Sequence, residues 1–137
     1  MDEHLIKAAM ERAMQKDMEW GVDDCCLWVC NVIMEYSGRD LAMPLRGYHS
    51  RIGAYRTLKK FAGGGLCEAA VKLAVMAALK SAKWPWKGTL VGVVADKNGP
   101  ALALFWRGMW VGRTERGITG LPASAGVVAW EIPPCRS

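Results

Sequence analysis

The sequence predicts an α+β protein in which N-terminal helices precede a small antiparallel sheet. Over residues 1–83, apolar residues recur every three to four positions, as they do on the buried face of a helix. Over residues 88–132, short apolar runs alternate with turn residues, which is typical of hairpins. With 137 residues, 52% of them hydrophobic, the chain fits one packed domain. We therefore expect residues 1–137 to form a single domain with a helical half and a sheet half.

Four helices are expected in the first half. Residues 2–18 place apolar side chains at helical spacing, and a turn segment at residues 20–24 ends this pattern. The second helix, from about Cys25 to Tyr36, is apolar on nearly all sides and should lie in the middle of the fold, with Asp24 as its N-cap. The third helix follows Ser50 and stops at the glycines of residues 63–65. The fourth spans residues 66–81.

Short strands are expected in the second half. The first covers residues 89–95, and the turn signal at residues 96–100 leads into residues 101–106. Residues 101–106 and 109–113 form a hairpin around Arg107-Gly108, and residues 117–121 and 127–132 supply two more strands. Trp84-Pro85-Trp86 is a turn segment, of which one indole is expected to pack between the helices and the sheet.

Composition limits the classes of function. No apolar run reaches the roughly 18 residues of a membrane span, and the opening residues do not form a signal peptide. The net charge of +5 comes from scattered basic residues, so a nucleic-acid-binding accessory protein is only an alternative supported by charge. The number of cysteines, five, is odd, which argues against a disulfide framework. Their spacing is not that of zinc ligands, so we expect no metal or other cofactor.

Cys25 is the candidate nucleophile. If Asp24 caps the second helix, Cys25 lies in its first turn, where unpaired backbone N–H groups and the helix dipole favour a thiolate. This position is expected to lower the pKa of the Cys25 thiol and prepare it for attack. The backbone N–H groups of Cys25 and Cys26 are then the expected oxyanion donors. Cys26, Cys30 and Cys67 fit small core positions better than reactive ones.

The same segment resembles that of the NlpC-type cell-wall peptidases, which are papain-like cysteine hydrolases of peptidoglycan peptides. Their Asp-Cys-Ser signature is similar to Asp24-Cys25-Cys26 at the start of a central helix that precedes a small sheet. Over nearly its full length, the chain more closely resembles a family of short phage and prophage proteins related to these peptidases. The shared features are Trp20-Gly21-x-x-Asp24-Cys25, Arg46-Gly47-Tyr48, Gly64-Gly65-Leu66, Lys87-Gly88 and Ala129-Trp130-Glu131-Ile132.

The sequence departs from the peptidase pattern at the base. In NlpC-like peptidases a histidine opens the second strand, whereas the corresponding residues 99–103 read Gly-Pro-Ala-Leu-Ala. No histidine follows His49. We expect His49 to be a solvent-facing loop residue, and its recruitment as the base is the weaker alternative. The candidates for the residue that would orient a base are Thr114, Glu115 and Thr119, and only their position in the sequence supports them. Loss of the base removes roughly a hundredfold or more of the rate.

The resemblance implies a protein of the phage tail tip or baseplate. We expect a structural or interaction module with a degenerate catalytic site, found in the virion tail or in the host cytoplasm before assembly. Its partners would be other tail or baseplate proteins, with peptidoglycan as a further ligand. The alternative is an active peptidoglycan amidase or endopeptidase that uses Cys25.

Two tryptophans mark an expected contact surface. Trp106 and Trp110 flank the turn at Arg107-Gly108, and exposed aromatic side chains beside arginine are typical of the core of a protein interface. At least one of the two indoles is therefore expected to be exposed, with a carbohydrate platform as the rival interpretation.

Overall fold

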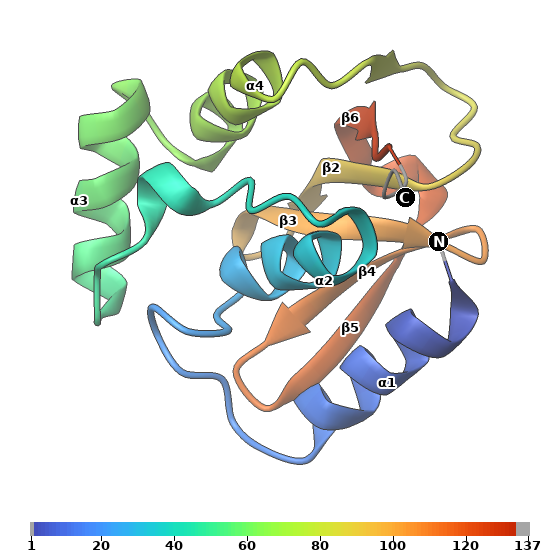
Figure 1. Cartoon of the computed structure of the whole chain (residues 1–137), viewed down its shortest axis with the longest axis horizontal. Helices are drawn as coiled ribbons and strands as arrows, with labels where there is room; N and C mark the ends of the chain where they lie inside the picture. Colours follow the sequence, from blue (N-terminus) through green and yellow to red (C-terminus); the bar gives the residue numbers. More distant parts are fainter. Residues whose placement is uncertain (1, 134–137) are drawn as a thin grey trace.

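A computed structural model of the chain describes residues 2–133. Helices make up the first part, namely α1 (Glu3–Met14), α2 (Leu27–Ser37), the short 3-10 helix η1 (Met43–Leu45), α3 (Arg51–Ala62) and α4 (Leu66–Met76). Strands make up the second part, namely β1 (Ser81–Ala82), β2 (Leu90–Asp96), β3 (Gly99–Trp106), β4 (Met109–Thr114), β5 (Gly117–Pro122) and β6 (Gly126–Glu131), with the 3-10 helix η2 (Ala123–Ala125) before β6. The α+β class with helices first is thereby confirmed (Figure 1).

The strands form one antiparallel sheet in the order β1-β6-β2-β3-β4-β5. The predicted hairpin around Arg107-Gly108 is confirmed, because Trp106 pairs with Met109 across a two-residue turn in which both residues have positive φ. β3 pairs with β2 from Gly99 to Phe105 but with β4 only over Leu104–Trp106. The hairpins β2–β3 and β4–β5 therefore diverge at the end where β3 begins.

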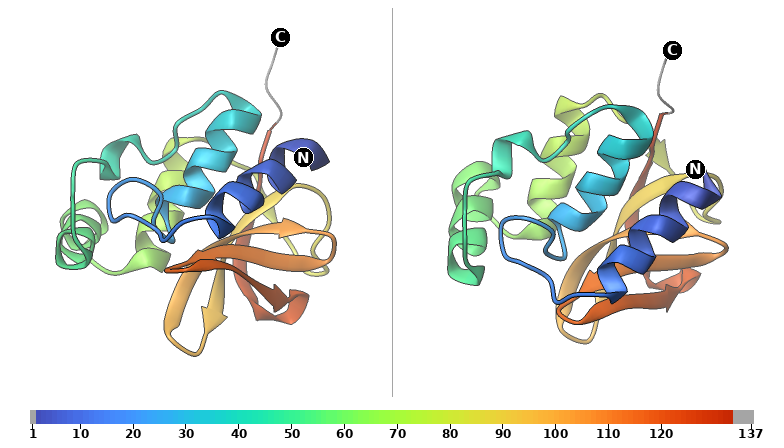
Figure 2. Two further views of the ribbon diagram at one scale, coloured as in Figure 1. Left: turned by 90° about the horizontal axis from the view of Figure 1, so that it is seen from below. Right: turned by 60° about the horizontal axis from the view of Figure 1, so that its bottom comes forward.

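The helices cover one face of the sheet (Figure 2). The principal core lies between them, and α2 contributes a nearly continuous set of buried side chains that includes Leu27, Val29 and Ile33. These side chains pack with Val91 and Leu104 of the sheet. The predicted central position of the second helix is confirmed, since an apolar helix is stable only where every side is covered.

A smaller core covers the opposite face of the sheet. Leu90, Val94 and the fully buried Trp110 form it, together with the half-buried Trp86. The indole of Trp86 lies edge-on to that of Trp110, with ring centroids 5.8 Å apart, and Gly92 leaves the room that Trp110 needs. The expected packing of one Trp84–Trp86 indole between helices and sheet is therefore wrong, because Trp86 packs on the far face and Trp84 is 60% exposed.

Two helices end earlier than the periodicity predicts. α1 stops at Met14 rather than at residue 18, and the N–H of Met18 instead donates to the carbonyl of Glu115 at 2.8 Å. α4 stops at Met76 rather than at residue 81, because Ser81 and Ala82 pair with β6 as the edge strand β1. Within residues 2–133, no helix has the length and apolar character required to cross a membrane.

Candidate functional site

The carboxylate of Asp24 organises the chain before α2. It is fully buried and accepts four hydrogen bonds, through Oδ1 from the N–H groups of Cys26 (3.1 Å) and Leu27 (3.0 Å), and through Oδ2 from the N–H of Gly21 (2.9 Å) and the hydroxyl of Tyr48 (2.6 Å). Asp24 thus satisfies two N–H groups at the helix start, as a capping side chain does, but the prediction that it is the N-cap residue is wrong, because that position belongs to Cys26. α2 itself begins at Leu27, two residues later than expected, so Cys25 precedes the first turn.

The segment Arg46-Gly47-Tyr48 connects the Asp24 cluster with Asp40 and with α2. Arg46 donates to both carboxylate oxygens of Asp40 at 2.9 Å and to the side-chain carbonyl of Asn31 on α2 at 2.9 Å. Burial and the hydrogen bond to Asp24 raise the pKa of Tyr48 well above its ordinary value, so the phenol remains a donor. Gly21 has a φ of +87°, and a side chain there would collide with the backbone carbonyl of Tyr48. The role of the Arg46-Gly47-Tyr48 motif is therefore to fix its loop against the Gly21 turn, Asp24 and α2.

Cys25 lines an open cleft of about 730 Å³. The cleft lies at the end of the sheet where the two hairpins diverge, and its opposite wall is the start of β3, from Gly99 to Ala103. Cys25 and the start of β3, where the resemblance to NlpC-like peptidases leads one to expect a histidine, therefore line the same cleft. The third-residue candidates Thr114, Glu115 and Thr119 also line the cleft.

The surroundings of Cys25 disfavour its thiolate form. Burial raises the pKa of Cys25 above its ordinary value, and the negative charge of Asp24 raises it further. The backbone N–H groups of Cys25 and Cys26 and the more distant Arg51 lower it, but they do not reverse the direction. The predicted low pKa is wrong, because desolvation and the capping carboxylate outweigh the dipole of a helix that starts after Cys25.

The expected role of the Cys26 N–H as an oxyanion donor is also wrong. This N–H donates to Oδ1 of Asp24, so it is already engaged. The pKa of the Cys26 thiol is raised, first by its interaction with the Cys30 thiol and second by burial. Cys30 is buried and Cys67 half-buried, and both belong to the principal core as expected; Cys135 lies outside the described residues.

Neither histidine reaches the cleft. His49 is exposed and does not line it, and His4 is exposed on the first turn of α1. The cleft does contain two residues of α3, the exposed Arg51 and Tyr55, and no sequence pattern indicated Tyr55. Arg51 donates to the Tyr55 hydroxyl at 3.3 Å. No local motif signals Tyr55, because it reaches the cleft only through the packing of α3 against η1 and α4.

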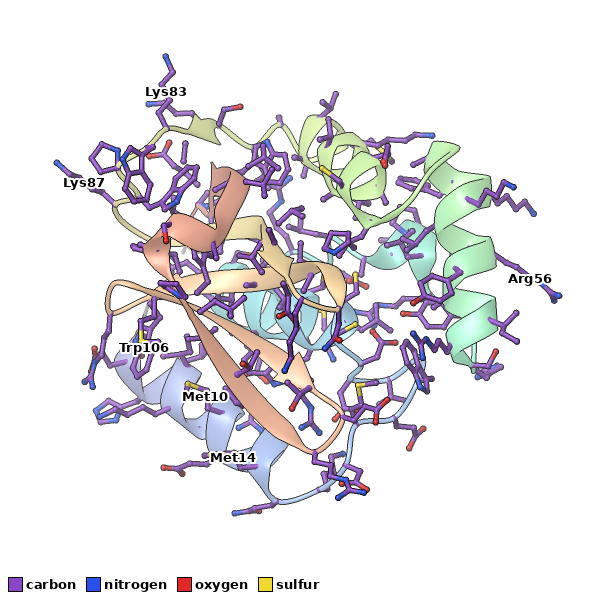
Figure 3. All side chains as sticks on the ribbon, turned by 180° about the vertical axis from the view of Figure 1, so that it is seen from behind. Met10, Met14, Arg56, Lys83, Lys87 and Trp106 are labelled. Carbon is purple, nitrogen blue, oxygen red and sulfur yellow. The ribbon has the colours of Figure 1, made fainter. Side chains whose placement is uncertain are left out.

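The expected aromatic contact surface at the β3–β4 turn is absent. Trp110 is fully buried, and its Nε1 donates to the carbonyl of Ala123 at 3.1 Å. Trp106 is half-buried against the principal core, to which Met10 of α1 also belongs (Figure 3). Strand alternation explains the correction, because Trp106 and Trp110 face opposite sides of a sheet that is covered on both.

Comparison with known proteins assigns a family and no function. Residues 2–132 match the family model described as a domain of unknown function (DUF6950), and the chain belongs to this family. No curated protein and no solved structure matches the chain. Among residues 2–133, no group of three or more His, Cys, Asp or Glu side chains is placed to hold a metal ion.

Proposed function

We propose that this DUF6950 member is a tail-tip or baseplate-associated protein of a phage or prophage, and that it has an NlpC-like fold with a degenerate hydrolytic site. It acts as a structural or interaction module. The proposal is supported by the resemblance of its motifs to short phage and prophage proteins and by the helices-then-sheet order. It is also supported by the position of Cys25 in a cleft just before the central helix.

One observation supports a degenerate hydrolytic site. The start of β3, from Gly99 to Ala103, lines the same cleft as Cys25, and none of its side chains accepts a proton from a thiol. Where no imidazole assists, a thiol whose pKa is raised stays protonated near neutral pH. We therefore expect the cleft to lack hydrolytic activity.

The chemical state of Cys25 is measurable by alkylation. We expect iodoacetamide to label Cys25 at about pH 7 more slowly than a free cysteine derivative, with the rate rising as the pH passes the raised pKa. The labelled residue is identified by mass spectrometry, and Cys25→Ser is the control for assignment. Faster labelling of Cys25 than of the free thiol near neutral pH contradicts the proposal.

The tail assignment is tested in particles produced from the genome that encodes the chain. The protein is expected in purified particles, and a gene deletion is expected to be complemented by Cys25→Ala as well as by the native chain. Absence from the particles overturns the structural assignment. If Cys25→Ala fails to complement, and the native protein releases peptides from purified cell walls, the protein is instead the active peptidoglycan hydrolase.

A further inference from the structure

A second hollow lies apart from the cleft and shares no lining residue with it. It has a volume of about 390 Å³, within the range of about 300–1,000 Å³ found for ligand sites. It forms where the segment between α2 and α3 passes α4 (Figure 1). Six apolar residues line this groove, and Arg39 and Asp40 complete it; the apolar residues are Leu41, Met43, Pro44, Leu73, Met76 and Ala77.

Large apolar side chains stand exposed at the groove. Met43 from η1 and Met76 from α4 are 69% and 59% exposed, although each carries a long apolar chain. Methionine side chains are flexible and polarizable, so they adapt to varied apolar partners. A concave apolar groove with such side chains is the geometry that accepts the apolar face of a helix.

The charge of the groove is positive and unbalanced. Arg46 neutralises Asp40 through two hydrogen bonds, as described above. Arg39 donates to the neutral carbonyl of Ala77 at 2.7 Å, and no carboxylate of residues 2–133 lies within ion-pair distance of it. The groove thus presents one cation that lacks a counter-charge.

The helix beside the groove adds to this charge. α3 contacts both η1 and α4, and it contains four Lys and Arg and no Asp or Glu, a net charge of +4. Arg56 of this helix extends away from the body of the molecule (Figure 3). This surface attracts acidic partners and is expected to speed their association.

We propose that this groove binds an amphipathic helix of a partner protein, in which acidic residues flank the apolar stripe. The apolar stripe fills the groove between Met43 and Met76, and a carboxylate pairs with Arg39. A lipid surface is disfavoured because it is too flat to enter a concave groove. Nucleic acid is disfavoured because the lining is apolar, and Arg39 is the one basic residue in it. The groove does not depend on Cys25 or on the cleft.

The probe is a fluorescent, acetylated and amidated 18-residue helix with leucines on one face and glutamates on the other. Its affinity is measured by anisotropy against the full chain, and Met76→Glu is expected to weaken it about tenfold. Val75→Glu is the matched control, since it adds the same charge on the same helix at a residue that is 75% exposed and outside the groove. It should change the affinity about threefold or less.

Two further arms test the charge and the class of partner. Arg39→Gln should weaken binding of the acidic peptide about threefold and reduce its dependence on salt. The same peptide with lysines in place of glutamates should not bind. Equal effects of Met76→Glu and Val75→Glu, binding of the lysine peptide, or no binding of the acidic peptide each overturn the proposal. Binding to anionic vesicles that Met76→Glu abolishes also overturns it, in favour of a membrane. Cys25→Ala should leave all of these results unchanged, which separates this proposal from that for the cleft.

Discussion

At the scale of single residues, Asp24 determines more of the site than Cys25 does. Its carboxylate joins the Gly21 turn, the start of α2 and the Tyr48 loop in one buried cluster. The same negative charge lies beside the Cys25 thiol and disfavours its ionisation. An acid that serves the fold by capping the helix therefore opposes the chemistry of a thiolate unless a cation or an imidazole balances it.

The Tyr48 hydroxyl should contribute measurably to stability. Tyr48→Phe removes the 2.6 Å bond to Oδ2 of Asp24 and leaves the buried carboxylate with one donor fewer. We expect a loss of about 1.5–3 kcal/mol in the free energy of unfolding, as is usual for a hydrogen bond to a charged group. Urea denaturation followed by circular dichroism measures it. Tyr55→Phe is the control, because Tyr55 is 58% exposed, and its loss should stay below about 0.5 kcal/mol. Equal losses for both variants contradict this role of Tyr48.

Local sequence explains part of this cluster. An aspartate before an apolar helical run predicts a cap, and Asp24 does accept from the N–H groups of Cys26 and Leu27, although the N-cap position itself is two residues later, at Cys26. Its fourth partner, Tyr48, lies 24 residues further along the chain, and no spacing rule connects the two. The raised pKa of Cys25 was missed for the same reason, because burial depends on residues brought together only by folding.

At the scale of elements, the alternation along β3 determines which side chains can serve Cys25. Leu102 and Leu104 belong to the core beneath the helices, whereas Ala101 and Ala103 pack against the core of the far face. Pro100 has the parity of Leu102 and is exposed at the cleft, so its side chain points to the helix side of the sheet, where Cys25 lies. A base introduced at residue 100 therefore lies in the cleft that Cys25 also lines.

Pro100→His should restore some reactivity to Cys25. An imidazole in the cleft stabilises the thiolate, and a pKa lowered by about one unit makes alkylation near neutral pH about tenfold faster. The measurement is the rate of iodoacetamide labelling at Cys25 as a function of pH. Lys97→His is the matched control, because Lys97 is exposed in the turn between β2 and β3 and does not line the cleft, so the rate should be unchanged. If both histidines act equally, the effect on Cys25 does not come from an imidazole in the cleft.

Helices and hairpins differ in how well their ends could be predicted. α3 was predicted closely, because Ser50 caps its start by accepting from the N–H of Gly53, and Gly63 with a φ of +74° ends it. The end of α4 was not predicted correctly, because Ser81–Ala82 carry no strand signal of their own and become β1 only by pairing with β6. Elements with local signals are predictable, and those formed by distant partners are not.

Trp110 should dominate the stability of the core on the far face of the sheet. It is fully buried between Phe105 and Trp86, with ring centroids 5.0 and 5.8 Å away. Trp110→Ala should lower the free energy of unfolding by about 3–5 kcal/mol because it leaves a large cavity. Trp84→Ala, at a residue that is 60% exposed, should cost less than about 1 kcal/mol. Thermal unfolding compares the two variants, and similar losses would show that Trp110 is not the centre of this core.

At the scale of the whole molecule, one side chain joins the segment after α1 to the β4–β5 hairpin, about 100 residues further along the chain. Arg113 of β4 is buried, and its guanidinium donates to the carbonyls of Ala13 (2.6 Å), Lys16 (2.9 Å) and Gly117 (3.0 Å). Asp23 lies 3.6 Å away and supplies the counter-charge. Arg113 thereby holds the end of α1 and the chain that leads to Asp24 against the β4–β5 hairpin, one wall of the cleft.

Arg113→Gln should destabilise the protein by about 3–5 kcal/mol, because the loss of a buried cation leaves Asp23 without this partner and the three carbonyls without donors. Arg113→Lys keeps the charge but cannot bridge three carbonyls with one ammonium group, so we expect a loss of about 2 kcal/mol. Amide exchange at Met18, whose N–H donates to Glu115, should accelerate in both variants before the core unfolds. The exposed Arg116 next to the hairpin turn provides the control, since Arg116→Gln removes the same charge without these carbonyls. Unchanged exchange at Met18 in Arg113→Gln would mean that α1 is held by its apolar face alone.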